Sequence, residues 1–287
     1  MSIEYFNKTL NESVDTDSNF RRWSDYRDAV TDYIKLYKNE SGTCIILGAG
    51  NILDINLGEL INPEYETVLA DIDVKSVEEG IKRLGLAKNI SVIKSDLGGL
   101  DACSFMKKAS LLTQGNDIAG LKKYLETYEF KSGSETDGFN NVMLSSVYTQ
   151  LFIPQFVYLL QQSSMDDIAK QAALEAALKF TAKLIKHVND EIIRMAAAGA
   201  SVCAWSDILE YTEGDNALYD IKNHIIDSIW MDEFYKTYVR DYGHGLGSYG
   251  IADLGERLGD LTEKWMIWPF SKKRTLIVKI IAGKVTS

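Results

Sequence analysis

Cysteine and histidine are both scarce in this chain of 287 residues, which contains three of each. The cysteines are an odd number and lie far apart, which argues against a disulfide framework and against a Cys-x-x-Cys metal site. The histidines likewise show no spacing typical of metal ligands. We therefore expect no metal site, and we interpret Cys44, Cys103 and Cys203 as buried thiols that pack as small apolar groups.

Long apolar runs and an excess of positive charge are also missing. No stretch reaches the ~20 apolar residues that a membrane span requires, and the polar N-terminus lacks the basic and apolar regions of a signal peptide. Lysine and arginine number 31 against 41 aspartates and glutamates, for a net charge of -10. Such a chain repels phosphate backbones and anionic lipids, so we expect it to bind neither nucleic acid nor membrane. From the lack of a signal peptide and of a membrane span we expect a cytoplasmic protein.

What the sequence does contain is an alternation of strand-like and helix-like segments. Residues 43–47 form a continuous apolar run that is typical of a buried strand, and 66–72, 89–96, 139–147 and 200–207 are four further strand-like segments. Apolar residues recur with helical spacing at 18–38 and 74–86. Strands that alternate with helices predict an α/β fold in which a parallel sheet is covered by helices on both faces.

The C-terminal segment departs from this alternation. Residues 264–270 and 275–283 are two further strand-like runs, joined only by the short polar link 271–274. A link of this length permits an antiparallel hairpin, whereas a parallel return needs a crossover of about a dozen residues or more. A mostly parallel sheet that ends in an antiparallel C-terminal hairpin is therefore expected.

A long helical pattern occupies residues 165–198. Ser164 and Asp167 offer a capping box at its start, and Gly199 offers a stop. Its apolar residues step alternately by four and three, which suits a core helix lying across the sheet. The same 3.5-residue period is used by helix pairs, so a homodimer seam is the alternative.

Glycines and acids mark a candidate ligand site at the strand ends. Gly48 and Gly50 follow the first strand, where glycine lets the backbone turn sharply and approach a ligand, and where a following helix would present free N–H groups. Asp71 ends the second strand about twenty residues later, where a carboxylate can accept both ribose hydroxyls of a nucleoside. Asp96 ends the third strand, near the expected position of an adenine amino group. Ligands of open α/β sheets bind at this edge.

The loop after the first strand lacks the devices that hold phosphate. The third glycine of the dinucleotide fingerprint is replaced by Leu53, and no Gly-Lys-Ser/Thr pattern follows. The loop therefore favours a nucleoside that carries an amino-acid tail. Two alternatives remain: a nucleotide-binding protein without catalysis, and an NAD(P)-dependent oxidoreductase, which Leu53 and the terminal hairpin disfavour.

Taken together, the motifs "ILGAGN", "VLADID", "IKSD" and "NVMLSSVYTQL" and the C-terminal hairpin resemble the class I S-adenosylmethionine-dependent methyltransferases. The resemblance spans residues 40–285 in element order and implies a three-layer Rossmann-like sandwich with a seven-stranded sheet. It implies S-adenosyl-L-methionine as cofactor and a binding site made of Gly48, Ala49, Gly50, Asn51, Asp71, Ile72, Asp96, Leu97 and Ser145.

The resemblance also implies a role for each of these residues. Gly48 and Gly50 would flank the amino-acid part of the cofactor, and Asp71 would hold the ribose. Asp96 would bind the adenine amino group, and Ser145 would face the sulfonium. Ile46 departs from the family, which commonly has an acid there; many members also carry glycine at the position of Ile52 or Leu53. Asn51 and Asp54 are candidates to contact the cofactor's ammonium or carboxylate.

Methyl transfer requires chiefly that the acceptor is placed in line with the bond from sulfur to the methyl group and that water is excluded. A general base is needed only if the acceptor starts protonated and its pKa is high. The acidic charge and the absence of an Asn-Pro-Pro-Tyr signature after the fourth strand favour a small-molecule acceptor. Candidate acceptor-site residues are Tyr148, Gln150, Trp205, Ser206, Asp207, Tyr211 and His244. We name His244 and Tyr148 as catalytic candidates, His244 because the glycines of its segment 241–250 suit a hinged lid; an exposed loop with an idle histidine is the alternative.

The domain hypothesis divides the chain at residue 40. Residues 1–40 form an N-terminal arm, up to about residue 16, and a helical cap, and 41–287 form the cofactor-binding domain, with 165–198 and 206–260 as acceptor-site or lid insertions. Trp23, Tyr26 and Tyr37 on the leading helix either cap the cofactor pocket or form a packing face.

Overall fold

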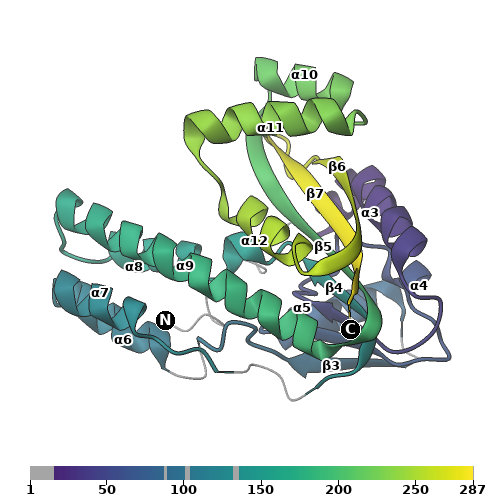
Figure 1. The fold of residues 1–287 in the computed structure, drawn as a ribbon, viewed down its shortest axis with the longest axis horizontal. Coiled ribbons are helices and arrows are strands. Elements are labelled where there is room, and N and C mark those ends of the chain that lie inside the picture. Colours follow the sequence, from purple (N-terminus) through teal and green to yellow (C-terminus); the bar gives the residue numbers. More distant parts are fainter. Residues whose placement is uncertain (1–15, 87–88, 101–103, 132–135, 287) are drawn as a thin grey trace.

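A seven-stranded sheet forms the middle of the molecule in the computed structural model, which describes residues 16–86, 89–100, 104–131 and 136–286 (Figure 1). The strand order is β3-β2-β1-β4-β5-β7-β6. The strands are β1 (Cys44–Leu47), β2 (Thr67–Asp71), β3 (Ile90–Lys94), β4 (Phe139–Ser145), β5 (Ala196–Thr212), β6 (Leu258–Trp268) and β7 (Arg274–Val285). The first five strands pair in parallel, and β7 runs antiparallel between β5 and β6. The predicted sheet and its terminal hairpin are confirmed.

Helices cover both faces of this sheet, as the prediction requires (Figure 1). They are α2 (Thr16–Arg22), α3 (Ser24–Tyr37), α4 (Leu57–Leu60), α5 (Val74–Leu84), α6 (Phe105–Gln114), α7 (Ile118–Glu126), α8 (Ile153–Gln161), α9 (Asp167–Met195), α10 (Asn216–His224), α11 (Ser228–Tyr242) and α12 (Leu246–Gly255), with a 3-10 turn η1 (Tyr148–Gln150). The result is a three-layer α/β sandwich. Within the described residues, no helix has both the length and the apolar character that crossing a membrane demands.

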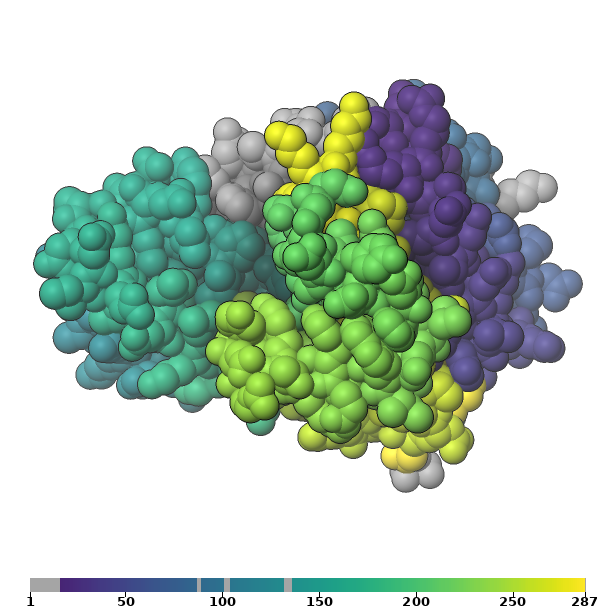
Figure 2. Space-filling model, turned by 90° about the horizontal axis from the view of Figure 1, so that it is seen from above, coloured from purple at the N-terminus to yellow at the C-terminus, as the bar shows by residue number. Residues whose placement is uncertain are grey.

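The two faces of the sheet belong to separate apolar cores because successive strand residues point to opposite sides. On β1, Ile45 and Leu47 join the core under α6–α9 and α12, whereas Ile46 joins the core under α3–α5. A smaller cluster lies between α10–α11 and the outer parts of β5–β7 and includes Trp265. Seen from above, the teal segment that includes α8 and α9 forms a lobe beside the green surface of α10–α12 (Figure 2).

The long helix α9 is a core helix, as the first interpretation proposed. Its inner face, including Phe180, Ile185 and Ile192, is at most 1% exposed within the chain itself. Its predicted boundaries are wrong: Asp166, rather than Ser164, caps the helix by accepting a hydrogen bond from the Ala169 amide at 2.8 Å. The helix ends at Met195 because the chain turns directly into β5, which includes Gly199. The homodimer stays a prediction.

The N-terminal and cysteine predictions are partly covered by the described residues. The helix expected over 18–38 is two helices, α2 and α3, with Trp23 between them. Cys203 is buried as expected and Cys44 is half-buried. Cys103 and residues 1–15 of the predicted arm lie outside the described residues.

The glycine-rich segment 241–250 is mostly helix, so its prediction as a loop is wrong. Only three residues separate α11 from α12. A Cβ atom on Gly250 would lie 2.4 Å from the Tyr148 ring, and one on Gly247 would lie 2.1 Å from the Asp207 carbonyl oxygen. These glycines let α12 pack closely on η1 and β5, which is a different use of glycine from the hinge that the sequence suggested.

Candidate functional site

The register of the sheet places several predicted site residues side by side at the carboxyl ends of their strands. Leu47 of β1 pairs with Ala70 of β2 on one side and with Leu144 of β4 on the other. The residues that follow these three therefore lie at the same carboxyl edge of the sheet: Gly48, Asp71 and Ser145. The chain reverses its direction of winding here, because β1 is flanked by β2 and β4, and such switch points are where α/β sheets bind ligands.

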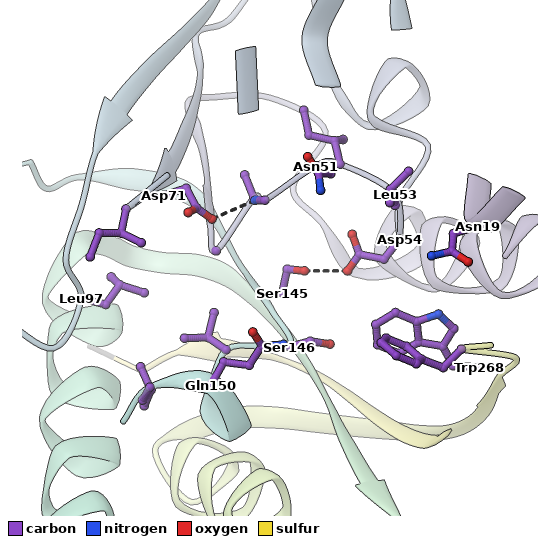
Figure 3. Close-up of a pocket in the computed structure, with 18 of the residues that line it drawn as sticks. Asn19, Asn51, Leu53, Asp54, Asp71, Leu97, Ser145, Ser146, Gln150 and Trp268 are labelled. Carbon is purple, nitrogen blue, oxygen red and sulfur yellow. Dashed lines mark hydrogen bonds between the residues drawn. The ribbon is translucent and has the colours of Figure 1, made fainter. Parts of the chain in front are cut away.

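A cavity of about 550 Å³ opens at this edge (Figure 3). Its walls come from the loop after β1, the ends of β2, β3 and β4, the N-terminal helices and the turn between β6 and β7. The residues that line it are Asn19, Trp23, Gly48, Ala49, Gly50, Asn51, Ile52, Leu53, Asp54, Asp71, Ile72, Ser95, Asp96, Leu97, Gly98, Ser145, Ser146, Val147, Gln150, Leu151, Trp268, Phe270, Ser271 and Arg274. A volume in this range suits a small-molecule or cofactor site.

The loop after β1 requires glycine at Gly48. Its φ is +70°, and a Cβ atom there would lie 2.3 Å from the Val147 Cγ2 atom. The Val147 side chain, just after β4, therefore occupies the space that a side chain at position 48 would need. Gly50 also has a positive φ, +46°, and its amide donates a 2.8 Å hydrogen bond to the Asp71 Oδ2 atom. The loop and the end of β2 are thus fixed to each other.

Asp71 is held with its carboxylate at the cavity wall. Its Oδ2 atom accepts from the Gly50 amide and its Oδ1 atom from the Asp73 amide, each at 2.8 Å. Burial raises the pKa of Asp71, and hydrogen bonds from the backbone of Asp73, Gly50 and Ile72 act against that rise. A carboxylate has about four lone-pair sites, so capacity remains for hydroxyl donors from a ligand.

An apolar slot with a polar end lies beside Asp71. Ile72 and Leu97 line the cavity and are 8% and 9% exposed. Asp96 lies two residues past the end of β3, where its Oδ1 atom accepts from the Gly98 amide at 3.2 Å. Two aliphatic side chains with an adjacent carboxylate suit a flat heterocycle that carries an amino group.

Asp54 is a buried carboxylate in the same cavity, only 8% exposed. Its Oδ2 atom accepts from the Ser145 hydroxyl at 2.6 Å and from the Trp205 indole Nε1 at 2.9 Å. Burial raises the pKa of Asp54 against these two donors and against the charge of Arg27. Figure 3 shows the hydrogen bond between Ser145 and Asp54, with Trp268 on the same side of the cavity as Asp54. The sequence named Asp54 only as a possible contact, because nothing local distinguishes a core acid from a turn acid.

Aromatic side chains close the far end of the cavity. The Trp23 ring stacks on Phe270 with centroids 5.6 Å apart and meets Trp268 edge-on at 4.9 Å. The Trp23 indole donates to the Phe270 carbonyl at 3.1 Å. Tyr26 stacks behind Trp268 at 4.9 Å and does not line the cavity, and neither does Tyr37. Of the three aromatic residues predicted as a cap, Trp23 alone has that position.

All nine residues predicted to bind the cofactor line this one cavity: Gly48, Ala49, Gly50, Asn51, Asp71, Ile72, Asp96, Leu97 and Ser145. Ile46, where the resemblance expects an acid, is 1% exposed and packs in the core under α3–α5. Cofactor binding by these residues stays a prediction.

The two catalytic candidates lie elsewhere, and their placement does not support that role. Tyr148 is fully buried, burial raises its pKa, and its hydroxyl donates to the Asn189 Oδ1 atom at 2.7 Å. His244 is exposed between α11 and α12, with its Nδ1 atom 3.5 Å from the Tyr235 hydroxyl. Neither side chain lines the cavity. Sequence position after β4 had suggested Tyr148, but the 3-10 turn η1 directs that ring into the core below α12.

The other residues predicted for the acceptor site differ in whether they reach the cavity. Gln150 lines the cavity. Because β5 continues to Thr212, four candidates lie within this strand instead of after it: Trp205, Ser206, Asp207 and Tyr211. Of these, Trp205 reaches the site through its hydrogen bond to Asp54. Throughout the described ranges, no group of three or more histidine, cysteine, aspartate or glutamate side chains is arranged to hold a metal ion.

The charge of the cavity wall is mainly negative. Asp54, Asp71 and Asp96 contribute three carboxylates. Arg274 also lines the cavity, and its guanidinium is paired with both carboxylate oxygens of Glu210 at 2.7 and 2.6 Å. A cationic ligand is therefore favoured over a polyanionic one.

The expected helix after the glycine loop is nearly absent. α4 is a single turn of four residues that begins only at Leu57. Leu53, at the position of the third glycine of a dinucleotide site, is 5% exposed and packs in the core under α3–α5. The site therefore lacks the helix N-terminus on which a pyrophosphate would rest.

Comparison with solved structures finds proteins whose names identify them as methyltransferases. A SAM-dependent methyltransferase of Thermotoga maritima, a possible histamine N-methyltransferase, is 9% identical with a TM-score of 0.46, each chain 97% covered. An O-methyltransferase family protein of Burkholderia thailandensis is 12% identical (TM-score 0.42); the match covers 95% of this chain and 58% of that one. N-methyltransferase NodS of Bradyrhizobium japonicum, in complex with S-adenosyl-l-homocysteine, is 11% identical (TM-score 0.42), with 91% and 87% covered.

No protein-family model and no curated protein matches the sequence. At the identities and TM-scores of the solved structures, the likeness carries no inference about chemistry. What the site can do follows from its own residues.

Proposed function

We propose that this protein is an S-adenosylmethionine-dependent methyltransferase that acts on a small-molecule acceptor. The observation that carries the proposal is the carboxylate of Asp71, held by the Gly50 and Asp73 amides at the wall of a negatively charged cavity that has no seat for pyrophosphate. That combination suits a nucleoside with a positively charged tail.

The proposed pose follows the walls of the cavity. The ribose hydroxyls donate to Asp71, and the adenine lies in the slot between Ile72 and Leu97 with its amino group at Asp96. The amino-acid tail follows the Gly48–Gly50 loop, and the sulfonium faces Ser145. The aromatic end of the cavity, with Trp23 and Trp268, is left for the acceptor.

The chemistry in this pose is an in-line displacement. A lone pair of the acceptor attacks the methyl carbon, the carbon–sulfur bond breaks, and its electron pair returns to sulfur, which leaves S-adenosylhomocysteine as a neutral thioether. Any proton on the acceptor passes to water or buffer. The protein's part is to hold the two reactants in line and to exclude water, which is the main source of rate in such a transfer.

The negative cavity separates this proposal from an NAD(P)-dependent oxidoreductase. A dinucleotide would bring a pyrophosphate against Asp54, Asp71 and Asp96, with Arg274 already paired to Glu210. A sulfonium nucleoside instead brings positive charge to the same surface, where each opposite charge is favourable.

Calorimetric titration with S-adenosylmethionine, S-adenosylhomocysteine and NAD tests the proposal. We expect the first two ligands to bind and Asp71→Ala to abolish binding of S-adenosylmethionine, because the ribose hydroxyls lose their acceptor. Asp117→Ala is the matched control: Asp117 caps α7 by accepting from the Gly120 amide, outside the cavity. Unchanged affinity in Asp71→Ala, or preferential binding of NAD, contradicts the proposal. Cofactor binding without transfer of a labelled methyl group to any of a broad panel of acceptors would favour a binding protein without catalysis.

A further inference from the structure

We propose that the methyl acceptor is a small amine that carries an apolar group, and that Asp54 binds the ammonium form of this amine. The inference rests on the proposed function and names the substrate class of the same site. It starts at the aromatic end of the cavity, which Trp23, Trp268 and Phe270 line and where the proposed pose of the cofactor leaves space for the acceptor.

The contacts of Asp54 place it with the aromatic end of the cavity. The Trp205 indole within β5 donates to the Oδ2 atom of Asp54 at 2.9 Å. Burial raises the pKa of Tyr26, and the charge of Asp54 adds to that rise. The Tyr26 ring stacks on Trp268 with centroids 4.9 Å apart, and Figure 3 shows Asp54 and Trp268 on the same side of the cavity. A ligand group bound by Asp54 therefore lies close to the aromatic rings.

The Asp54 carboxylate also adjoins the reacting atoms in the proposed pose. The Ser145 hydroxyl, which faces the sulfonium in that pose, donates to Oδ2 at 2.6 Å. Ser145 and Trp205 thus use the same oxygen. Because a carboxylate has about four lone-pair sites, Oδ1 keeps capacity for a donor from the cavity. A nitrogen bound by Oδ1 is placed beside the methyl group that it attacks.

The buried charge of Asp54 calls for a cation. Asp54 is 8% exposed, and Arg27 is the cation whose charge acts on it. Within the described residues, however, the Arg27 guanidinium donates to oxygen atoms of Phe20, Leu53 and Asn56 instead. An ionised carboxylate buried in this way is costly unless a cation and donors join it. An ammonium group supplies a positive charge and up to three donors.

The other charges of the cavity wall favour nitrogen over oxygen and sulfur as the accepting atom. Among the lining residues that the structure describes, the titratable ones are Asp54, Asp71, Asp96 and Arg274. An alcohol of high pKa would need a base much stronger than a carboxylate. A phenolate, thiolate or carboxylate would bring negative charge against the three carboxylates of the wall. An amine instead binds as a cation and reacts through a neutral lone pair.

Methyl transfer to such an amine needs no strong base from the protein. The ammonium loses one proton to solvent, and the nitrogen lone pair attacks the methyl carbon. The carbon–sulfur bond breaks and its electron pair stays on sulfur, so the products are a methylated ammonium and a neutral thioether. Asp54 keeps its charge and holds the nitrogen in line with the methyl group.

Binding to the protein saturated with S-adenosylhomocysteine tests the substrate class. Calorimetry compares benzylamine, a cation at neutral pH, with benzyl alcohol, which has nearly the same shape and no charge. We expect the wild type to bind benzylamine roughly 10- to 100-fold more tightly, the range for a hydrogen bond to a charged group. Asp54→Asn should remove this preference and bind S-adenosylhomocysteine like the wild type, because asparagine keeps an oxygen that accepts from Ser145 and Trp205.

Glu191→Gln is the matched control, because it removes one carboxylate of similar burial at another place. Glu191 on α9 is 7% exposed, accepts from the Arg194 guanidinium at 3.0 Å and does not line the cavity. This variant should keep the wild-type preference for benzylamine, which separates a contact at Asp54 from a general effect of net charge. Thermal melting of each variant shows that it is folded before titration.

Four results overturn the inference or its premise. Equal affinity of the wild type for the two probes, or no binding of benzylamine, means that the acceptor end does not select a cation. A preference that persists in Asp54→Asn means that Asp54 does not bind the amine. Weaker binding of S-adenosylhomocysteine by Asp54→Asn means that Asp54 contacts the cofactor. Failure of the wild type to bind S-adenosylhomocysteine overturns the proposed function itself, and it is recognised before either probe is added.

Discussion

The two ends of the cavity are built in different ways. The end proposed to hold the nucleoside, called the nucleoside end below, is formed by the loop 48–51 with Asp71, Ile72, Asp96 and Leu97, which lie at or just after the carboxyl ends of parallel strands. The aromatic end, formed by Trp23, Trp268 and Phe270, joins the N-terminal helices to the C-terminal hairpin, across 247 residues between Trp23 and Phe270. The first end depends on strand register, and the second depends on packing between the extremes of the chain.

This difference implies a separation of effects. Substitutions at the aromatic end should reduce stability and leave adenosine recognition intact, because these rings belong to the core under α3–α5. Substitutions at the nucleoside end should reduce cofactor affinity more than they reduce stability. The predictions below test that separation, beginning with the largest expected effect.

Trp268→Ala should lower the free energy of unfolding by about 3–5 kcal/mol, the usual cost of truncating a buried tryptophan. Trp268 is 7% exposed, and it contacts the rings of Trp23, Tyr26 and Phe270. Chemical denaturation measures this loss. Trp230→Ala is the control: Trp230 on α11 is only half-buried, so its removal should lower the free energy of unfolding by less. Protein that remains folded should bind adenosine with wild-type affinity; a comparable loss of adenosine affinity would mean that the two ends are not separable.

Gly48→Ala should cost about 1–2 kcal/mol for the left-handed backbone alone, plus the contact of its Cβ with Val147. We expect weaker binding of S-adenosylmethionine, because relief of the contact must move the loop away from β4. Gly50→Ala is the control: its φ is also positive, but the nearest atom to the added Cβ lies 4.0 Å away. Adding Val147→Ala to Gly48→Ala should restore part of the affinity; if it restores none, the contact is not the cause.

The sequence predicted, for a physical reason, that the residues of the loop 48–51 and the strand ends lie together at one cavity. Parallel strands that alternate with helices bring their carboxyl ends to one edge, so the order Gly48, Asp71, Asp96, Ser145 already implies a shared site. It did not predict that β5 continues past Asp207, or that α12 begins at Leu246. Both depend on tertiary packing, since β5 gains its length by pairing with β7, and α12 forms where glycines admit close contact.

The aromatic end and Asp54 could not be placed from the sequence. Trp268 and Phe270 were recognised only as parts of a hairpin, and nothing local relates them to Trp23. Asp54 acquires its position from Ser145 and Trp205, which are 91 and 151 residues away along the chain. Contacts at such separations leave no periodic signal in the sequence.

Asp54→Asn should change how the stability of the protein depends on pH. Burial raises the pKa of Asp54 above the value of ~3.9 expected in the unfolded chain. Between these two pKa values the folded state binds more protons than the unfolded state, so the carboxyl's contribution to stability falls as pH rises through that window. Without ligand, the melting temperature of Asp54→Asn should therefore rise relative to that of the wild type as the pH increases from about 4. A pH-independent difference between the two melting temperatures would contradict the raised pKa of Asp54.

His244→Ala should have the smallest effect of these substitutions. His244 is exposed and outside the cavity, and its ring contacts Tyr235, with Nδ1 3.5 Å from the hydroxyl and the ring centroids 6.3 Å apart. We expect the free energy of unfolding to change by no more than about 0.5 kcal/mol, as at most surface positions, and both cofactor affinity and methyl-transfer rate to be unchanged. A general base would contribute roughly 10²- to 10⁴-fold to the rate. A loss of that size in His244→Ala, with S-adenosylmethionine affinity intact, would show that α11 and α12 move to bring the imidazole to the acceptor, and that the aromatic end is only part of the acceptor site.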